Sequence, residues 1–210
     1  MPSNTGEYED AKETGRLEAF SDGVFSIAIT LLVLDIKVPR APDLMGRSTL
    51  SGALLRQWPT YVAYALSFVT ALIMWTNHHK LFRHIRRSNH TFLIINGMLL
   101  MLVTLVPFPT ALLAEHVSHR GATTATAIYS GMFVVIAVLF NVLWHYASHR
   151  GRLLARGHDP EAVAFITRQY RLGPILYFVA FLLAFVYVPA SVGLCALLAG
   201  FFALPETKRH

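Results

Sequence analysis

The stretch that decides the fold is Arg16-Leu17-Glu18-Ala19-Phe20-Ser21-Asp22-Gly23-Val24-Phe25-Ser26-Ile27-Ala28-Ile29-Thr30-Leu31-Leu32-Val33-Leu34-Asp35-Ile36. At about 1.5 Å per residue, a helix of this length crosses a hydrocarbon core of about 30 Å. It nevertheless carries Asp22 in its first third and hydroxyl groups at Ser21, Ser26 and Thr30. A carboxylate in an apolar helix needs donors on neighbouring helices, so we expect this segment to lie in a bundle and to line or support something polar.

The apolar residues of this segment repeat with the period of a helix. At about 100° per residue, one narrow stripe holds Phe20, Ile27, Thr30, Leu31 and Leu34, with Gly23 close by. Asp22 and Val33 point to nearly the opposite side. Two interpretations of the stripe remain open at this point, because packing against the next helix and lining of a path through the membrane give the same periodicity.

The composition is that of a membrane protein with a single membrane domain. Of its 210 residues, 54% are hydrophobic and only 14% are charged, and the mean hydropathy is +0.48. Residues 1–15 are polar and acidic and do not resemble a cleavable signal peptide, so we expect the first span to direct insertion. Cys195 is the single cysteine, which excludes an internal disulfide and a cysteine metal site.

Intervals without charge predict an all-α membrane protein with six transmembrane helices. The predicted spans are Arg16 to Ile36, about Trp58 to Thr76, a third within Ser88 to Ala114, about Thr126 to His145, about Gly173 to Val188, and about Ser191 to Leu204. The third is expected to stop at Pro107-Phe108-Pro109, because proline disfavours helix continuation. Pro189-Ala190-Ser191-Val192-Gly193 is expected to separate the last two.

The basic residues predict the orientation. Thirteen lie on the side of the two termini, and five lie on the other: Lys12, Arg16, Lys80, Arg83, Arg86, Arg87, Arg150, Arg152, Arg156, Arg168, Arg171, Lys208 and Arg209 against Lys37, Arg40, Arg47, Arg56 and Arg120. This sorting follows the positive-inside rule and explains the basic pI without a nucleic-acid partner. We therefore expect a cytoplasmic segment 1–15, a membrane domain 16–205 and a cytoplasmic tail 206–210.

The polar groups near the cytoplasmic ends of the first three spans are candidates for a buried network. Asp22 could accept a hydrogen bond from the Trp75 indole, from an imidazole of His78 or His79, or from Asn96. Adjacent histidines on a helix point about 100° apart and cannot readily ligate one ion, so no metal site is expected. The alternative for Asp22 is a helix-start carboxylate that is favoured only by the helix dipole.

Several segments of the first half of the chain resemble one family. The order Arg16-x-x-x-Phe20-Ser21-Asp22-Gly23, followed by a span that ends Leu-Leu-Val-Leu-Asp-Ile, is similar to the first helix of prokaryotic members of the transmembrane protein 175 family. Trp75-Thr76-Asn77-His78-His79-Lys80-Leu81-Phe82, Asn96 and Leu105-Val106-Pro107-Phe108-Pro109-Thr110 continue the resemblance. The family comprises potassium channels built without the usual selectivity-filter loop.

The resemblance implies a potassium channel of the plasma membrane that needs no cofactor. It implies a homotetramer in membrane lipid, in which the first helix of each copy lines a central pore for potassium ions. Ile27, Leu31 and Leu34 would form hydrophobic constrictions, with Ile27 the narrowest, and Thr30 would form a ring of hydroxyls between them. Arg16, Ser21, Asp22, Trp75, His78, His79 and Asn96 would hold this helix in place. Selectivity for potassium over sodium should then be modest.

Two other classes of function stay open. A proton-coupled secondary transporter, or a proton-permeable channel, could use Asp22 and His78 as a relay, because imidazole titrates near neutral pH. A membrane enzyme such as a lipid hydrolase is disfavoured, because the sequence has no evident pair of nucleophile and base. It also lacks a Gly-x-x-x-x-Gly-Lys phosphate loop and a His-Glu-x-x-His motif.

Overall fold

The structure is a computed structural model that describes residues 5–40, 49–155 and 157–203. The predicted tail 206–210, the end of the predicted sixth span at Leu204 and residues 1–4 of the predicted N-terminal segment lie outside these ranges. So do Arg47, Arg156, Lys208 and Arg209 of the basic residues counted above.

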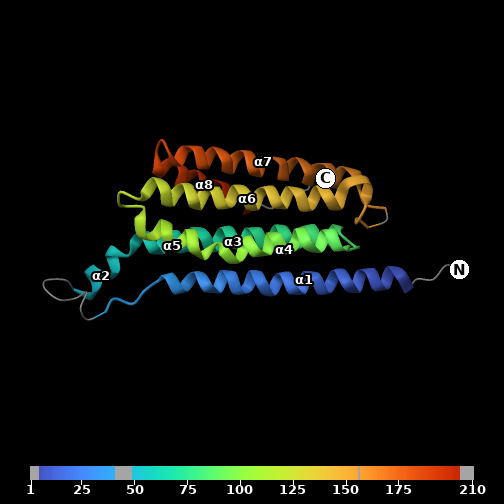
Figure 1. The fold of residues 1–210 in the computed structure, drawn as a ribbon, viewed down its shortest axis with the longest axis horizontal. Coiled ribbons are helices and arrows are strands. Elements are labelled where there is room, and N and C mark those ends of the chain that lie inside the picture. The colour runs from blue at the N-terminus through green and yellow to red at the C-terminus, as the bar shows by residue number, and fades with distance from the viewer. Residues whose placement is uncertain (1–4, 41–48, 156, 204–210) are drawn as a thin grey trace.

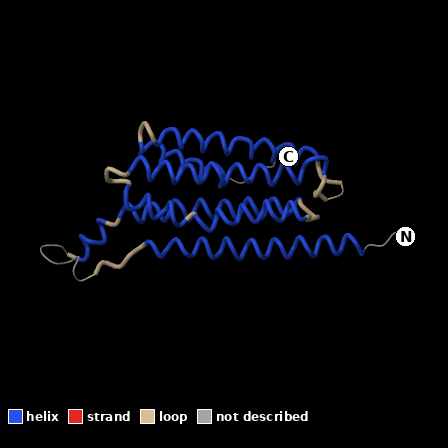
Figure 2. The backbone as a smooth tube through the Cα atoms, in the orientation of Figure 1, coloured by secondary structure: helices blue, strands red, loops and turns tan. Residues whose placement is uncertain are grey.

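The described residues form helices joined by short connections, and the long helices run antiparallel along one axis (Figures 1 and 2). In chain order they are α1 (Thr5–Leu31) with the short 3₁₀ turn η1 (Leu32–Asp35), α2 (Leu50–Arg56), α3 (Trp58–His84), α4 (His90–Leu105), α5 (Pro107–His116), α6 (Ala122–Ser148) with the turn η3 (His149–Gly151), α7 (Pro160–Ala184) and α8 (Val188–Ala203). In Figure 1, α1 lies along one edge, α3, α4 and α5 lie in the middle, and α6, α7 and α8 lie beyond them.

Four stretches of the described residues are long and apolar enough to cross a membrane. They are Glu13–Asp35, Trp58–His84, His90–His116 and Ala122–Gly151. The apolar helix Val188–Phe202 is shorter, and α7 carries Arg168 and Arg171 in its first half. The all-helical class is therefore confirmed, and the count of six spans stays a prediction.

Two helix breaks were predicted at prolines, and both exist, but neither has the predicted form. α4 ends at Leu105, just before Pro107, yet the chain continues as a helix. α5 begins at Pro107 directly after Val106, which keeps helical backbone angles (φ −53°, ψ −37°), so α4 and α5 together form the stretch His90–His116. The chain turns at Phe185 to Tyr187, before Pro189, which lies in the first turn of α8. In both places proline occupies a first helical turn, where its missing N–H would have had no partner in the helix.

Buried side chains from α1, α3, α4 and α6 form the core. Phe25, Phe92, Tyr129, Phe133 and Trp144 are among its largest fully buried members. At the end where the N-terminus lies, the connection after α3 pairs with the connection after α6, since the backbone N–H of Arg86 donates to the carbonyl of Leu153 at 2.9 Å. These contacts fix the ends of α3 and α6 against each other, and hence the polar side chains near the end of α3.

Candidate pore helix and its polar anchor

Only one face of α1 packs against the rest of the chain. Ser21, Phe25, Ala28 and Leu32 are buried, and they follow one another at intervals of three and four residues, which is one face of a helix. Their neighbours are α3 and α4. This face differs from the predicted stripe, and Asp22 lies at its margin, half-buried.

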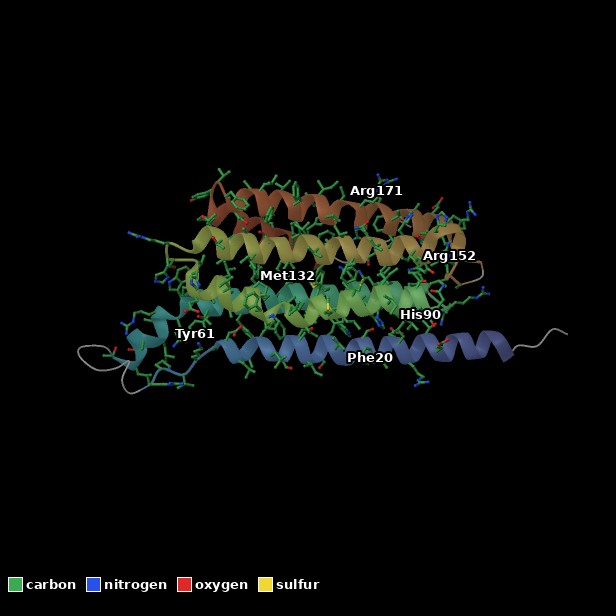
Figure 3. The ribbon with its side chains drawn as sticks, in the orientation of Figure 1. Phe20, Tyr61, His90, Met132, Arg152 and Arg171 are labelled. Atoms are coloured by element: carbon green, nitrogen blue, oxygen red, sulfur yellow. The ribbon has the colours of Figure 1, made fainter. Side chains whose placement is uncertain are left out.

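The predicted stripe lies on the outward face of α1. The exposed fractions are 63% for Phe20, 60% for Ile27, 41% for Leu31 and 69% for Leu34, and Gly23 and Thr30 are also exposed. In Figure 3, α1 forms the lower edge of the chain, with Phe20 labelled on it. Within one chain, therefore, the stripe does not pack against any other helix in the described part and is available to lipid or to another copy.

The end of the outward face has its own local geometry. η1 is a 3₁₀ turn, in which side chains three residues apart eclipse each other, so Leu34 follows almost directly behind Leu31. The Thr30 hydroxyl donates to the Ile27 carbonyl at 2.9 Å. Its oxygen keeps a lone pair for an ion or water on this face, but its proton is already used.

Val33 was expected on the face opposite the stripe, and it is 49% exposed. The packed face of Ser21, Phe25, Ala28 and Leu32 therefore does not extend to Val33.

A hydrogen bond joins the acid of α1 to α3. The indole N–H of Trp75 donates to Asp22 Oδ1 at 2.8 Å, which is one of the three partners predicted for Asp22. One turn further toward the N-terminus, His79 Nδ1 lies 2.8 Å from Glu18 Oε1. Glu18 is four residues from Asp22 on α1, and His79 is four residues from Trp75 on α3. The two antiparallel helices therefore meet at two successive turns.

A second set of hydrogen bonds lies deeper and joins three helices. The Asn96 amide on α4 donates to Ser21 Oγ on α1 at 3.0 Å, and Ser21 in turn donates to the Leu17 carbonyl at 2.8 Å. His78 Nε2 on α3 lies 2.8 Å from Asn96 Oδ1. Since an amide oxygen only accepts, this nitrogen carries the proton of His78. All three linked side chains, Ser21, His78 and Asn96, are fully buried.

The environment of His78 is otherwise aromatic. Its ring stacks on Phe82 with a centroid distance of 4.6 Å and lies 5.4 Å from Phe25. Its second nitrogen, Nδ1, is buried and has no hydrogen-bond partner among the described residues. His78 therefore works as a single donor to Asn96, and the predicted alternative of an imidazole bond to Asp22 is not formed.

Six of the seven residues predicted for the anchor lie in these two sets of contacts, and Arg16 does not. Arg16 is exposed, and the described chain brings no partner to it. Glu18 was missed, although the four-residue spacing of Glu18 and Asp22, matched by Trp75 and His79, is visible in the sequence. No group of three or more histidine, cysteine, aspartate or glutamate side chains that could hold a metal occurs in the described residues.

The comparison with known proteins agrees with the resemblance noted above. The sequence model of TMEM175, described as an endosomal/lysosomal potassium channel, matches residues 16–107. A protein of Chamaesiphon minutus named as a potassium channel is 53% identical over 198 residues, which are 94% of this chain and 97% of that protein. This chain belongs to the TMEM175 family.

Solved structures and more distant relatives extend this finding. The TMEM175 fold is also seen in the crystal structure of a lysosomal potassium-selective channel TMEM175 homolog from Chamaesiphon minutus, with a TM-score of 0.84, 51% identity, and coverage of 91% of this chain and 97% of that one. A Danio rerio protein named endosomal/lysosomal proton channel TMEM175 is 37% identical over 127 residues, 58% of this chain and 24% of that protein. Family and apolar helices together make this TMEM175 member a multi-pass membrane protein.

Proposed function

We propose that this protein is a potassium channel in which α1 from several copies lines a central pore. The observation that carries the proposal is the outward face of α1, where Ile27, Thr30 and Leu31 are exposed on a helix at the edge of the subunit. One helix cannot enclose a path for ions, so copies must meet along this face. The family resemblance favours four copies, and relatives named as potassium channels support the permeant ion.

Hydrophobic rings would then do the gating. An ion that passes a ring of Ile27 side chains must shed water and gains little coordination, so conduction requires the ring to widen and wet. Potassium is less strongly hydrated than sodium and would lose less. Selectivity by this route is modest, because the ring presents only aliphatic groups.

The polar contacts between α1 and its neighbours would serve as an anchor. They lie on the inner side of α1, and the exposed stripe lies on the outer side, so the two sets of residues have different tasks. The anchor holds the register and rotation of α1, which decides whether Ile27 or a neighbouring residue faces the axis. We place both termini in the cytoplasm and the channel in the plasma membrane.

A proton-permeable channel is the second candidate. It is favoured by a relative named as a proton channel and by the buried, unpartnered Nδ1 of His78. A proton relay between Asp22 and His78 would need a hydrogen bond between them. Instead, Asp22 is bonded to Trp75 and His78 to Asn96, which argues against such a relay.

Reversal potentials of the purified protein in planar bilayers separate these candidates. With a tenfold potassium gradient at symmetric pH, the current should reverse near the potassium potential, and a pH gradient imposed at symmetric potassium should shift the reversal potential little. A reversal potential that follows pH and ignores potassium would contradict the potassium channel and favour proton permeation.

A further inference from the structure

We infer that the gap between α3 and α7 binds one anionic phospholipid, with its phosphate at the basic end of the gap and a short segment of one acyl chain in the apolar part. The inference rests on two hollows that share a wall. It concerns a partner of the subunit outside the pore and does not depend on which ion the channel conducts.

The first hollow is a basic groove between the end of α3 and the first half of α7. Its volume is about 370 Å³, and its lining includes Lys80, Arg83 and His84 from α3 and Gln169 from α7. No acidic side chain is among the described residues that line it. A concave surface lined by two positively charged side chains and an amide suits a phosphate, which accepts several charge-assisted hydrogen bonds.

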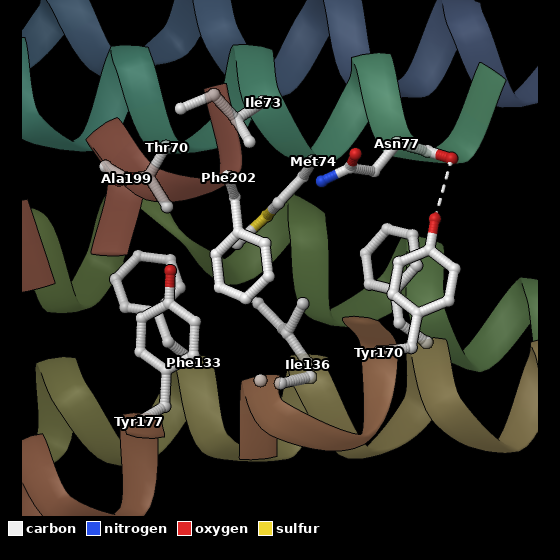
Figure 4. A pocket seen from close by; sticks show the side chains of 13 residues that line it. Thr70, Ile73, Met74, Asn77, Phe133, Ile136, Tyr170, Tyr177, Ala199 and Phe202 are labelled. Atoms are coloured by element: carbon white, nitrogen blue, oxygen red, sulfur yellow. Dashed lines mark hydrogen bonds between the residues drawn. The ribbon is translucent and has the colours of Figure 1, made fainter. Parts of the chain in front are cut away.

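The second hollow is an apolar cavity of about 60 Å³. Figure 4 shows side chains that line it, which come from α3, α6, α7 and α8 and include Met74, Ile136 and Phe202. An apolar space of this volume takes a short segment of hydrocarbon, while the rest of an acyl chain would lie in the bilayer. It offers nothing to a free anion.

The two hollows follow each other along the same pair of helices. Asn77 and Tyr170 line both of them. Figure 4 shows these two residues at one end of the cavity, where the Tyr170 hydroxyl donates to the Asn77 carbonyl at 3.2 Å. Along α3 the cavity spans Thr70 to Asn77 and the groove continues to His84, so the apolar part lies nearer the middle of the membrane.

This order matches an inserted lipid. The groove lies at the end of the molecule where the basic loops gather, which we assign to the cytoplasmic leaflet, and that leaflet is rich in anionic lipid. The positive-inside rule explains the charges of this end but not a hollow lined by them. A molecule with a negative head and a hydrocarbon tail satisfies both hollows at once.

Native mass spectrometry of the purified protein with added lipid tests the inference. Wild type should retain dioleoyl phosphatidylglycerol at least fivefold more tightly than dioleoyl phosphatidylcholine, and the double variant Lys80→Gln/Arg83→Gln should lose most of this preference. Arg86→Gln is the matched control. Arg86 is exposed at the same end of the molecule and does not line the groove, so the substitution removes a charge without changing the groove. An equal loss from Arg86→Gln would overturn the inference, since general surface charge would then explain the binding.

A second variant tests the apolar part and separates lipid from free phosphate. Ala199→Leu adds bulk to the cavity, because Ala199 lines it and is buried. It should weaken retention of phosphatidylglycerol severalfold, provided that its size-exclusion profile matches wild type. Inorganic phosphate at millimolar concentration should not displace the lipid. Displacement by phosphate, with no effect of Ala199→Leu, would overturn the lipid and leave a simple anion site.

Discussion

At the scale of single residues, some hydrogen-bond partners in the anchor of α1 could be predicted from the sequence and others could not. Trp75 was a predicted donor to Asp22, because both lie near the same membrane face and indole is an obligatory donor when buried. The bond from His78 to Asn96 could not be predicted, because it depends on the rotation of α4 relative to α3. That rotation is set by the packing of large side chains such as Phe82 and Phe92, whose rings lie 5.8 Å apart.

Loss of the Asp22 carboxylate should weaken the assembled protein more than it alters ion preference. Asp22→Ala leaves the half-buried Trp75 N–H without its acceptor, which costs about 1 kcal/mol, at the lower end of the range for a buried donor. Trp75→Phe removes the same bond from the other side and should act similarly, while Trp58→Phe, an exposed indole at the opposite end of α3, should do little. Heating followed by size-exclusion chromatography measures the stability. A stable Asp22→Ala assembly with changed selectivity would mean that the carboxylate faces the ion.

At the scale of elements, the periodicity of α1 identified the residues that share one face of the helix. It did not show what that face contacts. The sequence placed the stripe and the acid on different faces, and the structure leaves the stripe outside the subunit core. The prolines indicated breaks near the right places but not how the chain continues, for a physical reason. Proline is penalised inside a helix but accepted in its first turn, so the sequence alone does not distinguish an end from a new beginning.

The packed face of α1 should tolerate no added volume. Ala28 is 2% exposed between α1 and its neighbours, so Ala28→Leu should push α1 away and cost about 1–3 kcal/mol through overpacking. Ala65→Leu is the matched control, because Ala65 is exposed on α3. Apparent melting temperatures of the two purified variants should differ by several degrees. Equal values would indicate that α1 does not pack on α3 and α4 in the assembled protein.

At the scale of the whole molecule, composition predicted a helical membrane protein, and the distribution of basic residues predicted its orientation. The four stretches that are long enough to span were visible from hydropathy. A span in lipid must bond its own backbone groups, so it is a long helix with apolar side chains, and such a segment stands out in the sequence. The hairpin of α7 and α8 was harder to bound. Arg168 and Arg171 lie inside α7, so a search for uncharged intervals starts that helix too late.

The orientation can be checked with an impermeant maleimide on intact cells. The variant Arg86→Cys should not react, since the positive-inside rule places this loop in the cytoplasm. The variant Ser118→Cys, exposed at the opposite end, should react. The natural Cys195 is buried and should stay silent. Labelling at Arg86 before the cells are opened, with none at Ser118, would reverse the orientation.

We propose that the outward face of α1 lines the pore and that Ile27 is its main constriction. Ile27→Asn offers hydrogen bonds to water and ions at that ring, so it should wet the constriction and raise sodium permeation relative to potassium. Ile175→Asn is the matched control, since Ile175 on α7 is 61% exposed against 60% for Ile27.

Bi-ionic reversal potentials of the reconstituted protein measure this effect directly. With potassium on one side and sodium on the other, we expect a reversal potential shifted toward zero for Ile27→Asn and unchanged for Ile175→Asn. An unchanged permeability ratio in Ile27→Asn, with current intact, would mean that the stripe is packing and the pore lies elsewhere.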